Sequence, residues 1–495
     1  MSVKGGEELN AGAETARGGW RRAAAWARSR SLELSLLLSL WFLYGCAINA
    51  ANLEAFNLQQ AGVEALAERG QFSLEGSTLR RFQIKVYRDG DKPFGDTFLY
   101  EGRQYAAKQP GQFMAGAAIY SALRPLGLSY ATDYLLAAAL VTFFTASLVT
   151  AAAALAVFCA ARELIASPPA RAWPLACALA YGLATTGFAY SGVAHHDQIA
   201  SGYLMIAFCL AVKLARGRFE GRGAKALLLA ACAGLLLGLA VTTSMLTAVL
   251  ACVVGLYLVA SCGRSALVPS LAGAAVGVAP LLIYNALAFG NPLLLANVAG
   301  GYTDTYLRLD LDDLPGKVSI YASALTAYAP VFWAGLLGLA FFPRESRRER
   351  LVVVAVVALL LVQVLNIDSD GGCQYGPRYL LPGMPFACLG LAGFAHLRAG
   401  ASRLAALVVV ILAASFSLFV NAVGAFCGAM YCTPEAFAPR HYLSMLGRGE
   451  WAALPLAAWL ALPLAASAAW LARAAFKRGV TATEEKIELT PDSAL

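Results

Sequence analysis

The sequence has very little charge for its length. Only 14% of its 495 residues are Asp, Glu, Lys or Arg, whereas 59% are hydrophobic, and the mean hydropathy is +0.62. A soluble domain has about 45–50% apolar and about 25% charged residues. The low charge therefore excludes an ordinary soluble protein and predicts a chain that crosses a membrane many times.

Several motifs of large enzyme classes are absent as well. The sequence contains no P-loop, no G-x-S-x-G, no H-E-x-x-H and no glycine fingerprint of a Rossmann fold, and it has only four histidines. The net charge of +8 is interpreted as a signal for membrane topology in the short basic links between apolar runs, not as a nucleic-acid footprint. We therefore expect no nucleic-acid partner.

Long apolar runs are what the sequence has in abundance. A helix needs about 20 residues to cross roughly 30 Å of hydrocarbon, and about twelve runs approach that length. They begin near Leu32, Asp133, Trp173, Ala200, Ala226, Ser244, Leu267, Ala327, Leu351, Tyr379, Leu404 and Ala452. The predicted fold class is an all-α polytopic membrane protein with about 12 transmembrane helices and a small mixed α/β outer loop after the first span.

The basic links predict the orientation in the membrane. "RGRFEGRGAK", "PRESRRER" and "HLRAGASR" fall on one side, which the positive-inside rule assigns to the cytoplasm. Residues 1–31 and 476–495 are then cytoplasmic tails around a membrane domain at 32–475. The long or polar segments on the outer side, where we expect the chemistry, are 52–132, 287–326, 366–378 and 425–451.

The first outer segment carries the clearest local patterns. From Leu53 to Gly70 apolar residues recur every three to four positions, which predicts an amphipathic helix at the membrane surface. "YEGRQY" predicts a hairpin, and Pro110 fits the first turn of a new helix. Lys108 stands just before that helix N-terminus, an arrangement that suits a lipid phosphate. Contact of Lys108 and Arg103 with anionic headgroups is the simpler alternative.

Other polar groups on the outer side are less specific. "AHHDQ" brings His195, His196 and Asp197 together in sequence, but adjacent residues point in different directions, so we expect contacts to acceptor or phosphate and no metal. Asp310, Asp312 and Asp313 read as a solvated loop, because calcium-loop spacing is absent. Asp368 and Asp370 precede a loop at the rim of the same side. Cys427 and Cys432 are spaced for a short-loop disulfide in an oxidising compartment.

Four stretches taken together resemble the GT-C superfamily of integral-membrane glycosyltransferases, in its protein O-mannosyltransferase and aminoarabinose-transferase-like branch (glycosyltransferase family 39-like). They are "NAANLEAF", "LYEGRQYAAKQPGQFMAGAAIYSAL", "NALAFGNPLLLANVAGGY" and "GGCQYGPRYLLPGMPFACLGLA". The resemblance covers about residues 32 to 425, and its Lys-x-Pro-Gly and Gly-Pro-Arg-Tyr elements are the most specific. It implies a polyprenyl-phosphate-sugar donor and transfer, with inversion, to a lipid, glycan or protein acceptor outside the membrane.

The resemblance also implies roles for residues. Glu54 matches the acidic position of the general base, where the family often has Asp, and Asn52 and Glu64 compete for that role. A carboxylate at the membrane rim accepts the proton of an attacking hydroxyl, which supports the assignment independently. The leaving phosphate requires cations, for which Arg378 and Lys108 come first and Arg103 next. His195, His196, Asp197, Asn52, Asp368, Asp370, Tyr375 and Tyr379 are candidate acceptor or cavity contacts.

Cofactor and location follow from the same reasoning. The sequence implies no firm cofactor and leaves a divalent cation open. The many bacterial members of the family imply a bacterial inner-membrane protein whose active site faces the periplasm. A multi-span transporter or a flippase of lipid-linked glycans is the main alternative, although few ionisable residues lie within spans and no repeat relates the two halves. A receptor whose outer loops only bind a ligand is a further alternative.

Overall fold

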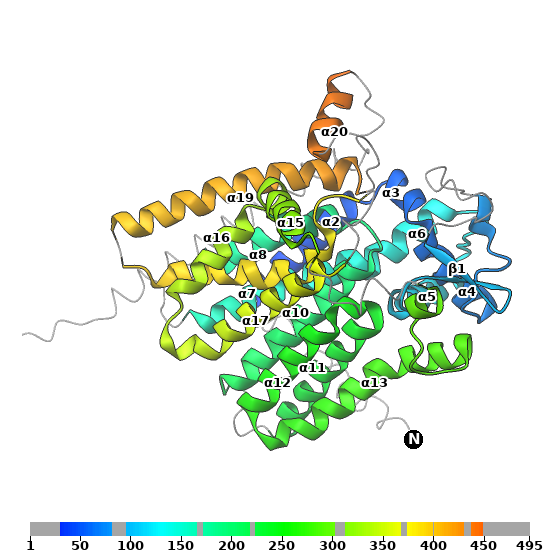
Figure 1. Cartoon of the computed structure of the whole chain (residues 1–495), viewed down its shortest axis with the longest axis horizontal. Coiled ribbons are helices and arrows are strands. Elements are labelled where there is room, and N and C mark those ends of the chain that lie inside the picture. Colours follow the sequence, from blue (N-terminus) through cyan, green and yellow to red (C-terminus); the bar gives the residue numbers. More distant parts are fainter. Residues whose placement is uncertain are drawn as a thin grey trace, which may run out of the picture.

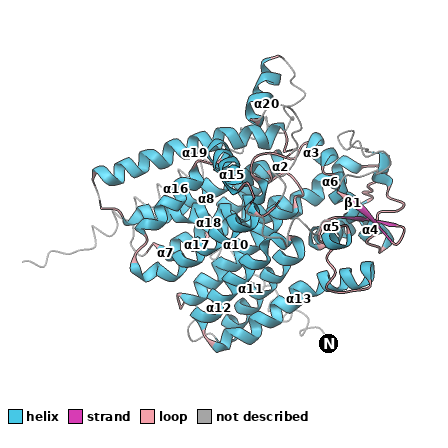
Figure 2. Cartoon of the chain, in the orientation of Figure 1, coloured by secondary structure: helices cyan, strands magenta, loops and turns pink. Residues whose placement is uncertain are grey.

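The computed structural model describes residues 30–81, 96–165, 172–217, 223–301, 312–367, 374–398, 400–429 and 437–448. In this part of the chain almost all regular structure is helical, with one two-stranded sheet (Figures 1 and 2). The predicted tails at 1–31 and 476–495 and the apolar run near Ala452 lie almost entirely outside the described residues.

Seven helices of the described part are long and apolar enough to cross a membrane, or eight if one bent pair is a single span. They are Tyr134–Leu164 (α6, Tyr134–Thr142; a π-helical turn; α7, Leu148–Leu164), α10 (His196–Ala215), α11 (Gly223–Thr243), Met245–Cys262 (ending in α12, Ala248–Cys262), α13 (Arg264–Phe289), Arg378–His396 (η8, Arg378–Gly383; α18, Met384–Gly390; η9, Leu391–His396) and α19 (Ala401–Cys427). The bent pair is α15 (Leu314–Tyr328) with α16 (Val331–Gly338), which meet at 101°.

The predicted runs fall on these helices, but the number twelve is not confirmed. Three further runs correspond to α2 (Ser31–Cys46), α8 (Ala172–Ala184) and α17 (Arg347–Leu365). The first two have fewer than 18 residues, and α17 begins with four charged residues, Arg347 to Arg350. Short and charged helices do not meet the length and composition of a full span, so the described residues contain seven or eight such helices and the number twelve stays a prediction.

Two neighbouring helices, α11 and α13, touch through glycine. α11 carries "GLLLG" at 234–238 and α13 carries "GAAVG" at 273–277, with both pairs facing the other helix. A Cβ on Gly273 would overlap the carbonyl oxygen of Ala231, and one on Gly234 would overlap that of Ser270. Small residues four apart let two helix backbones approach closely, which is how helices pack without a hydrophobic driving force in lipid.

The basic links gather at one end of the bundle. The guanidinium of Arg216, just after α10, lies 3.2 Å from the carboxylate of Glu349 in α17 and donates to Ser346 at 2.9 Å. Tyr257 of α12 donates to the same carboxylate at 3.0 Å. α10 has 20 residues and is therefore about 30 Å long, so its first residues lie a membrane thickness away from this basic end.

The first outer segment folds beside that other end of α10. It contains α3 (Ala50–Ala55), α4 (Asn57–Arg69), a 3-10 turn (Thr78–Arg81), β1 (Thr97–Tyr100), β2 (Arg103–Ala106) and α5 (Gly111–Leu123). In Figure 1 these blue and cyan elements form a group at the right-hand side of the helices. The remaining short helices are α9 (Thr186–Ala189), α14 (Ala296–Ala299) and α20 (Ala438–Gly447). The predicted small α/β outer loop is therefore present as one hairpin among helices.

The helix predicted from Leu53 to Gly70 exists but does not lie on a surface. It breaks at Phe56 into α3 and α4, and it ends at Gly70 in the left-handed conformation, as predicted. Residues 57–65 are all buried, because α5 covers one side, where Phe113 packs on Gly62, and the hydroxyl of Tyr130 donates to Gln60 at 2.7 Å on another. Several of the polar residues that made the helix look amphipathic, such as Gln60 and Glu64, bond to protein instead of water.

The predicted hairpin is confirmed in position and register. Tyr100 pairs with Arg103, and the two turn residues Glu101 and Gly102 have positive φ of 49° and 76°, the combination of a type I′ turn. Phe98 and Tyr105 of the hairpin pack against Phe289 at the end of α13. This aromatic contact fixes the hairpin on the bundle, and with it the segment that leads to Lys108.

Candidate functional site

Four segments that are far apart in sequence meet at the beginning of α10. They are the link from β2 to α5, the end of α11, the first turn of α10, and the turn that starts η8. α5 reaches α11 closely, because a Cβ on Gly111 would overlap the hydroxyl of Thr243. Ser244, just after α11, joins this helix end to α10, because its hydroxyl donates to Asp197 Oδ1 at 2.6 Å.

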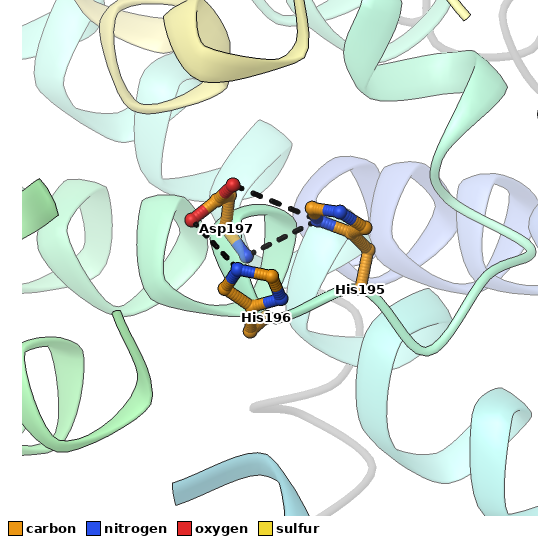
Figure 3. A group of neighbouring side chains, drawn as sticks. All are labelled: His195, His196 and Asp197. Atoms are coloured by element: carbon orange, nitrogen blue, oxygen red, sulfur yellow. Dashed lines mark hydrogen bonds and ion pairs between the residues drawn. The ribbon is translucent and has the colours of Figure 1, made fainter. Parts of the chain in front are cut away.

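The side chains of His195, His196 and Asp197 converge, although they are consecutive (Figure 3). His195 is the N-cap of α10, and its Nδ1 accepts the backbone N–H of Asp197 at 3.3 Å. His196 Nε2 lies 3.4 Å from Asp197 Oδ1, and the two imidazoles stack with centroids 4.5 Å apart. The expectation that adjacent residues point apart does not hold here, because a cap folds the residue before a helix back over its first turn.

Asp197 keeps one oxygen without a partner. Its Oδ1 is held by Ser244 and His196, whereas its Oδ2 is buried with no hydrogen bond among the described residues. The nearest ring nitrogen, Nδ1 of His195, is 3.9 Å away, which is too long for a hydrogen bond. A buried carboxylate oxygen without a donor is costly in a folded protein, so this oxygen is suited to accept from a ligand.

Arg378 places a guanidinium at the same point from the other half of the chain. Its side chain is only 7% exposed, its Nη1 lies 3.4 Å from His195 Nε2, and its Nη2 donates to the Tyr379 hydroxyl at 2.9 Å. The guanidinium also lies over the Tyr379 ring, 4.3 Å from its centroid. Stacking on one face and bonding at one edge orient the fork of the guanidinium.

Lys108 reaches the cluster from the hairpin. Its ammonium forms an ion pair of 3.0 Å with Asp96, the residue before β1. The pKa of Asp96 lies below its ordinary value chiefly because of Lys108, and the positive charge of Arg378 contributes as well. Lys108 is therefore paired with Asp96, and Arg378 is near enough for its charge to act on the same carboxylate.

His195 is a neutral member of this group. Its side chain is fully buried, and burial together with the neighbouring His196 ring holds its pKa well below the ordinary histidine value. Phe56 after α3 packs edge-on against His195, and Tyr190 after α9 covers its other side. The ring is therefore a rigid hydrogen-bonding group with no charge at neutral pH.

The histidine and aspartate group has the residue types of a metal site. One ligand atom from each of the three residues lies within 4.8 Å of the others. However, the Nδ1 lone pair of His195 already accepts the helix N–H, and a guanidinium nitrogen lies 3.4 Å from Nε2 of the same ring. A divalent cation would have two full ligands and a positive neighbour, so these residues fit it poorly.

Glu54 is exposed on α3, and Phe56, two residues later in the chain, packs edge-on against His195. Glu64, its predicted competitor, is fully buried, where Ser77 and Thr78 donate to the carboxylate and Arg69 lies 3.7 Å away. Those bonds give Glu64 a structural role and remove it as a candidate base.

Three other predicted residues also have structural roles or lie away from the group. The Asn52 side chain accepts from the backbone N–H of Ala429 at 2.8 Å. The Tyr375 hydroxyl donates to the Val420 carbonyl at 2.6 Å inside the bundle. Arg103 is exposed at the end of β2 that is opposite to Lys108. Asp368, Asp370 and Cys432 lie outside the described residues, so their predicted roles and the pairing of Cys432 with Cys427 stay predictions.

Two members of the group were not found from the sequence. Asp96 pairs with Lys108, and Ser244 holds Asp197. Asp96 lies in "FGDTFLY", where a turn-forming Asp before a strand gives no sign of a partner twelve residues later. Ser244 lies at the junction of two apolar runs, where a single polar residue was the only available signal.

Comparisons with known proteins give structural similarity alone. No family model matches the chain, and no curated protein matches it in sequence. Among solved structures, it is similar to ArnT from Cupriavidus metallidurans bound to undecaprenyl phosphate, with 13% identity, a TM-score of 0.48, and coverage of 90% of this chain and 73% of that one.

A second similarity is to the archaeal oligosaccharyltransferase AglB from Archaeoglobus fulgidus, in complex with an inhibitory peptide and a dolichol-phosphate. The identity is 14%, the TM-score is 0.43, and the match covers 83% of this chain and 57% of AglB. The apo form of the oligosaccharyltransferase of that organism has 13% identity and a TM-score of 0.46, and the match covers 81% of this chain and 57% of that one. The sequence resemblance pointed to glycosyltransferases of this kind. At such low identities and TM-scores the similarity concerns the course of the backbone only. A function for this chain must therefore be argued from the residues of its own site.

Proposed function

We propose that the protein is a membrane glycosyltransferase that transfers a sugar from a polyprenyl-phosphate donor to an acceptor at the membrane surface. The observation that supports it most is the buried guanidinium of Arg378 beside His195 at the start of α10, with Lys108 paired to an aspartate, Asp96, whose pKa both cations lower. Both cations lie about 30 Å of helix away from the basic links, at the depth of a lipid headgroup. A phosphate on a lipid is an anion that reaches that depth without leaving the membrane.

Burial of Arg378 supports an anionic ligand. The guanidinium is buried where few water molecules compete for it, and its planar fork matches two phosphate oxygens. Asp96 and Asp197 supply negative charge in the protein, and Asp96 is 45% exposed while Lys108 is 14% exposed. A donor phosphate would compete with Asp96 for Lys108, and the cations would then stabilise the charge that develops on the leaving phosphate.

Asp197 supports a sugar as the group attached to that phosphate. Its buried Oδ2 needs a donor, and the hydroxyl groups of a sugar are donors of the required kind. Because Ser244 and His196 fix the other oxygen, the carboxylate is already oriented. We assign Asp197 to a sugar hydroxyl next to the phosphate.

Glu54 is proposed as the general base. It is exposed on α3 while that helix contacts the cluster through Phe56, so an acceptor hydroxyl can approach it from outside the bundle. Attack from that side, opposite to the phosphate, would invert the anomeric carbon. By the positive-inside rule this side is the periplasmic or outer face of an inner membrane.

The experiment is a donor-conversion assay on the protein purified in detergent. Sugar-linked polyprenyl phosphates extracted from the source membranes are added with an acceptor extract, and mass spectrometry follows the release of polyprenyl phosphate. Wild type should convert one lipid, and Glu54→Gln should bind it with conversion lowered by about 10²- to 10⁴-fold, the usual contribution of general base catalysis.

Two outcomes would contradict the assignment. Full conversion by Glu54→Gln would remove the base, and lipid that is bound or moved between leaflets without loss of its sugar would favour a flippase or transporter. Glu68→Gln is the matched control, because Glu68 lies on the same outer segment and its carboxylate is held by the Tyr120 hydroxyl.

A further inference from the structure

His195 presents a conflict that the protein alone does not resolve. Its Nδ1 faces a backbone N–H, that of Asp197, at 3.3 Å. Its Nε2 faces another donor, the Nη1 of Arg378, at 3.4 Å. A neutral imidazole carries one proton and has one acceptor nitrogen. In either tautomer one ring N–H therefore points at a second donor.

The helix cap decides which nitrogen carries the proton. The N–H of Asp197 belongs to the first turn of α10 and cannot turn away without unwinding that turn, whereas the guanidinium of Arg378 has further N–H groups, one of which already donates to Tyr379. Nδ1 therefore accepts, and the proton lies on Nε2. That leaves the Nε2–H of His195 and a guanidinium N–H side by side.

Protonation of the ring does not remove the conflict. An imidazolium would place a hydrogen on Nδ1 against the Asp197 N–H as well, and the ring is fully buried between Phe56, Tyr190 and His196. The groups that face it are Arg378, Lys108, Asp197 and His196, two of which are cations. The ring stays neutral.

Two converging donors define a place for an acceptor. Nitrogens 3.4 Å apart can both lie within about 2.9 Å of one oxygen at the apex of a triangle. Arg378 brings a positive charge and His195 brings direction, because its ring cannot rotate without breaking the cap.

We propose that the Nε2–H of His195 donates to a phosphate oxygen that Arg378 also binds, so that a neutral histidine completes the donor site. This inference rests on the proposed function for the identity of the phosphate. The same chemistry would suit a free phosphate, and the two sources are separated below.

Two substitutions separate the roles of the ring. His195→Asn keeps an oxygen at the position of Nδ1 and so keeps the cap, but it has no group at the position of Nε2. His195→Gln places an amide N–H near the position of Nε2 and loses the cap. The capping role and the phosphate role therefore change in opposite directions in the two variants.

Binding is measured with the full chain in lipid nanodiscs, with undecaprenyl phosphate and inorganic phosphate as separate probes. We expect His195→Asn to weaken undecaprenyl phosphate about tenfold to hundredfold, the worth of a hydrogen bond to a charged group, with an unchanged melting temperature. His195→Gln should bind within about threefold of wild type and melt at a lower temperature. Equal affinity of His195→Asn and wild type would overturn the proposal. Tight binding of inorganic phosphate would name a free anion as the ligand.

A second measurement needs no variant. In protein labelled with ¹⁵N-histidine, each of the four histidine rings gives two ring-nitrogen signals. One ring should show a neutral Nε2–H whose signal moves when undecaprenyl phosphate is added and stays when undecaprenol is added. Absence of a response in all four rings would contradict the role of His195. If the response is present but Lys108→Ala with Arg378→Ala still converts donor, the proposed function fails separately from this inference.

Discussion

At the scale of single residues, some side chains of the site supply charge and others supply hydrogen bonds of fixed direction. Arg378 and Lys108 provide positive charge, Asp197 provides an acceptor with one unsatisfied oxygen, and His195 provides a neutral ring held by a helix cap. Each of these groups is fixed by a second residue, namely Tyr379, Asp96, Ser244 and Phe56. Such pairs keep polar groups oriented before a ligand arrives, which lowers the cost of binding.

Asp197→Asn should distinguish sugar from phosphate. The substitution removes a negative charge near the phosphate position and weakens the acceptor for a sugar hydroxyl. We expect affinity for the sugar-linked lipid to fall about tenfold, the value of one hydrogen bond to a charged group, while affinity for undecaprenyl phosphate without sugar is unchanged or higher. Competition binding of the two lipids measures both. A parallel loss for both lipids would show that Asp197 acts only on the fold.

The pH dependence of stability should report the buried ring of His195. Its pKa in the folded protein is well below its ordinary value because of burial, whereas in the unfolded chain it is about 6.5. Below pH 6.5 the unfolded chain therefore binds a proton that the folded protein excludes, and stability falls as the pH falls. Between pH 7.5 and 5.5 wild type should lose more stability than His195→Asn, by up to about 1.4 kcal/mol per pH unit below 6.5. Equal losses of stability in wild type and His195→Asn, measured as a thermal-shift series over this pH range, would contradict the role of the buried His195 ring.

At the scale of elements, close helix contacts hold the segments that meet at the site. α11 leads directly to Ser244, and its position depends on the glycine contact with α13. The hairpin depends on the aromatic contact with Phe289 at the other end of α13. Packing that is distant from the polar groups therefore decides where Lys108 and Ser244 lie.

Gly273→Leu should separate α11 from α13. The new side chain would overlap the Ala231 carbonyl, and overpacking of a tight contact typically costs about 1–3 kcal/mol. Ala275→Leu is the control, because Ala275 is exposed on the same helix two residues away. Thermal unfolding in detergent should show a lower melting temperature for Gly273→Leu only. An equal change in both variants would show that lipid-facing substitution is responsible.

The sequence predicted elements better than contacts. Local rules placed the hairpin, the helix after Pro110 and the end at Gly70, because turn residues and φ preferences act within a few positions. The burial of α4 was missed, since polar residues that bond to protein have the same pattern as residues that face water. The link between Lys108 and Asp96 was missed for the same reason, because pairing across a fold leaves no periodic signal.

At the scale of the whole molecule, two polar ends are separated by apolar helices. One end holds Arg216 and Glu349 near the basic links, and the other holds the residues that we propose to bind phosphate and the hairpin. The residues that the sequence assigned to chemistry lie mainly at the second end. Asn52 and Tyr375 lie near that end but have structural roles, because the sequence cannot tell a buried polar residue that binds backbone from one that faces a ligand.

The orientation can be measured by cysteine labelling. Arg103→Cys lies next to the exposed turn of the hairpin, and Arg348→Cys lies at the exposed start of α17. Labelling of the wild-type protein, which keeps its native cysteines, gives the background signal. We expect a membrane-impermeant maleimide to label position 103 in intact cells and position 348 only after the membrane is opened, because basic links stay in the cytoplasm. The reverse pattern would place the site in the cytoplasm and contradict transfer on the outer face.

The central claim is that a polyprenyl phosphate binds between Arg378 and Lys108. The most direct measurement is native mass spectrometry of the protein released from its own membranes, beside Lys108→Ala with Arg378→Ala and beside the control Arg344→Ala with Arg348→Ala at the basic end. We predict a bound polyprenyl phosphate, with or without sugar, in wild type and control and its loss in the first double variant. Lipid retained equally by all three proteins, or taken up by none of them when undecaprenyl phosphate is added, would contradict the account.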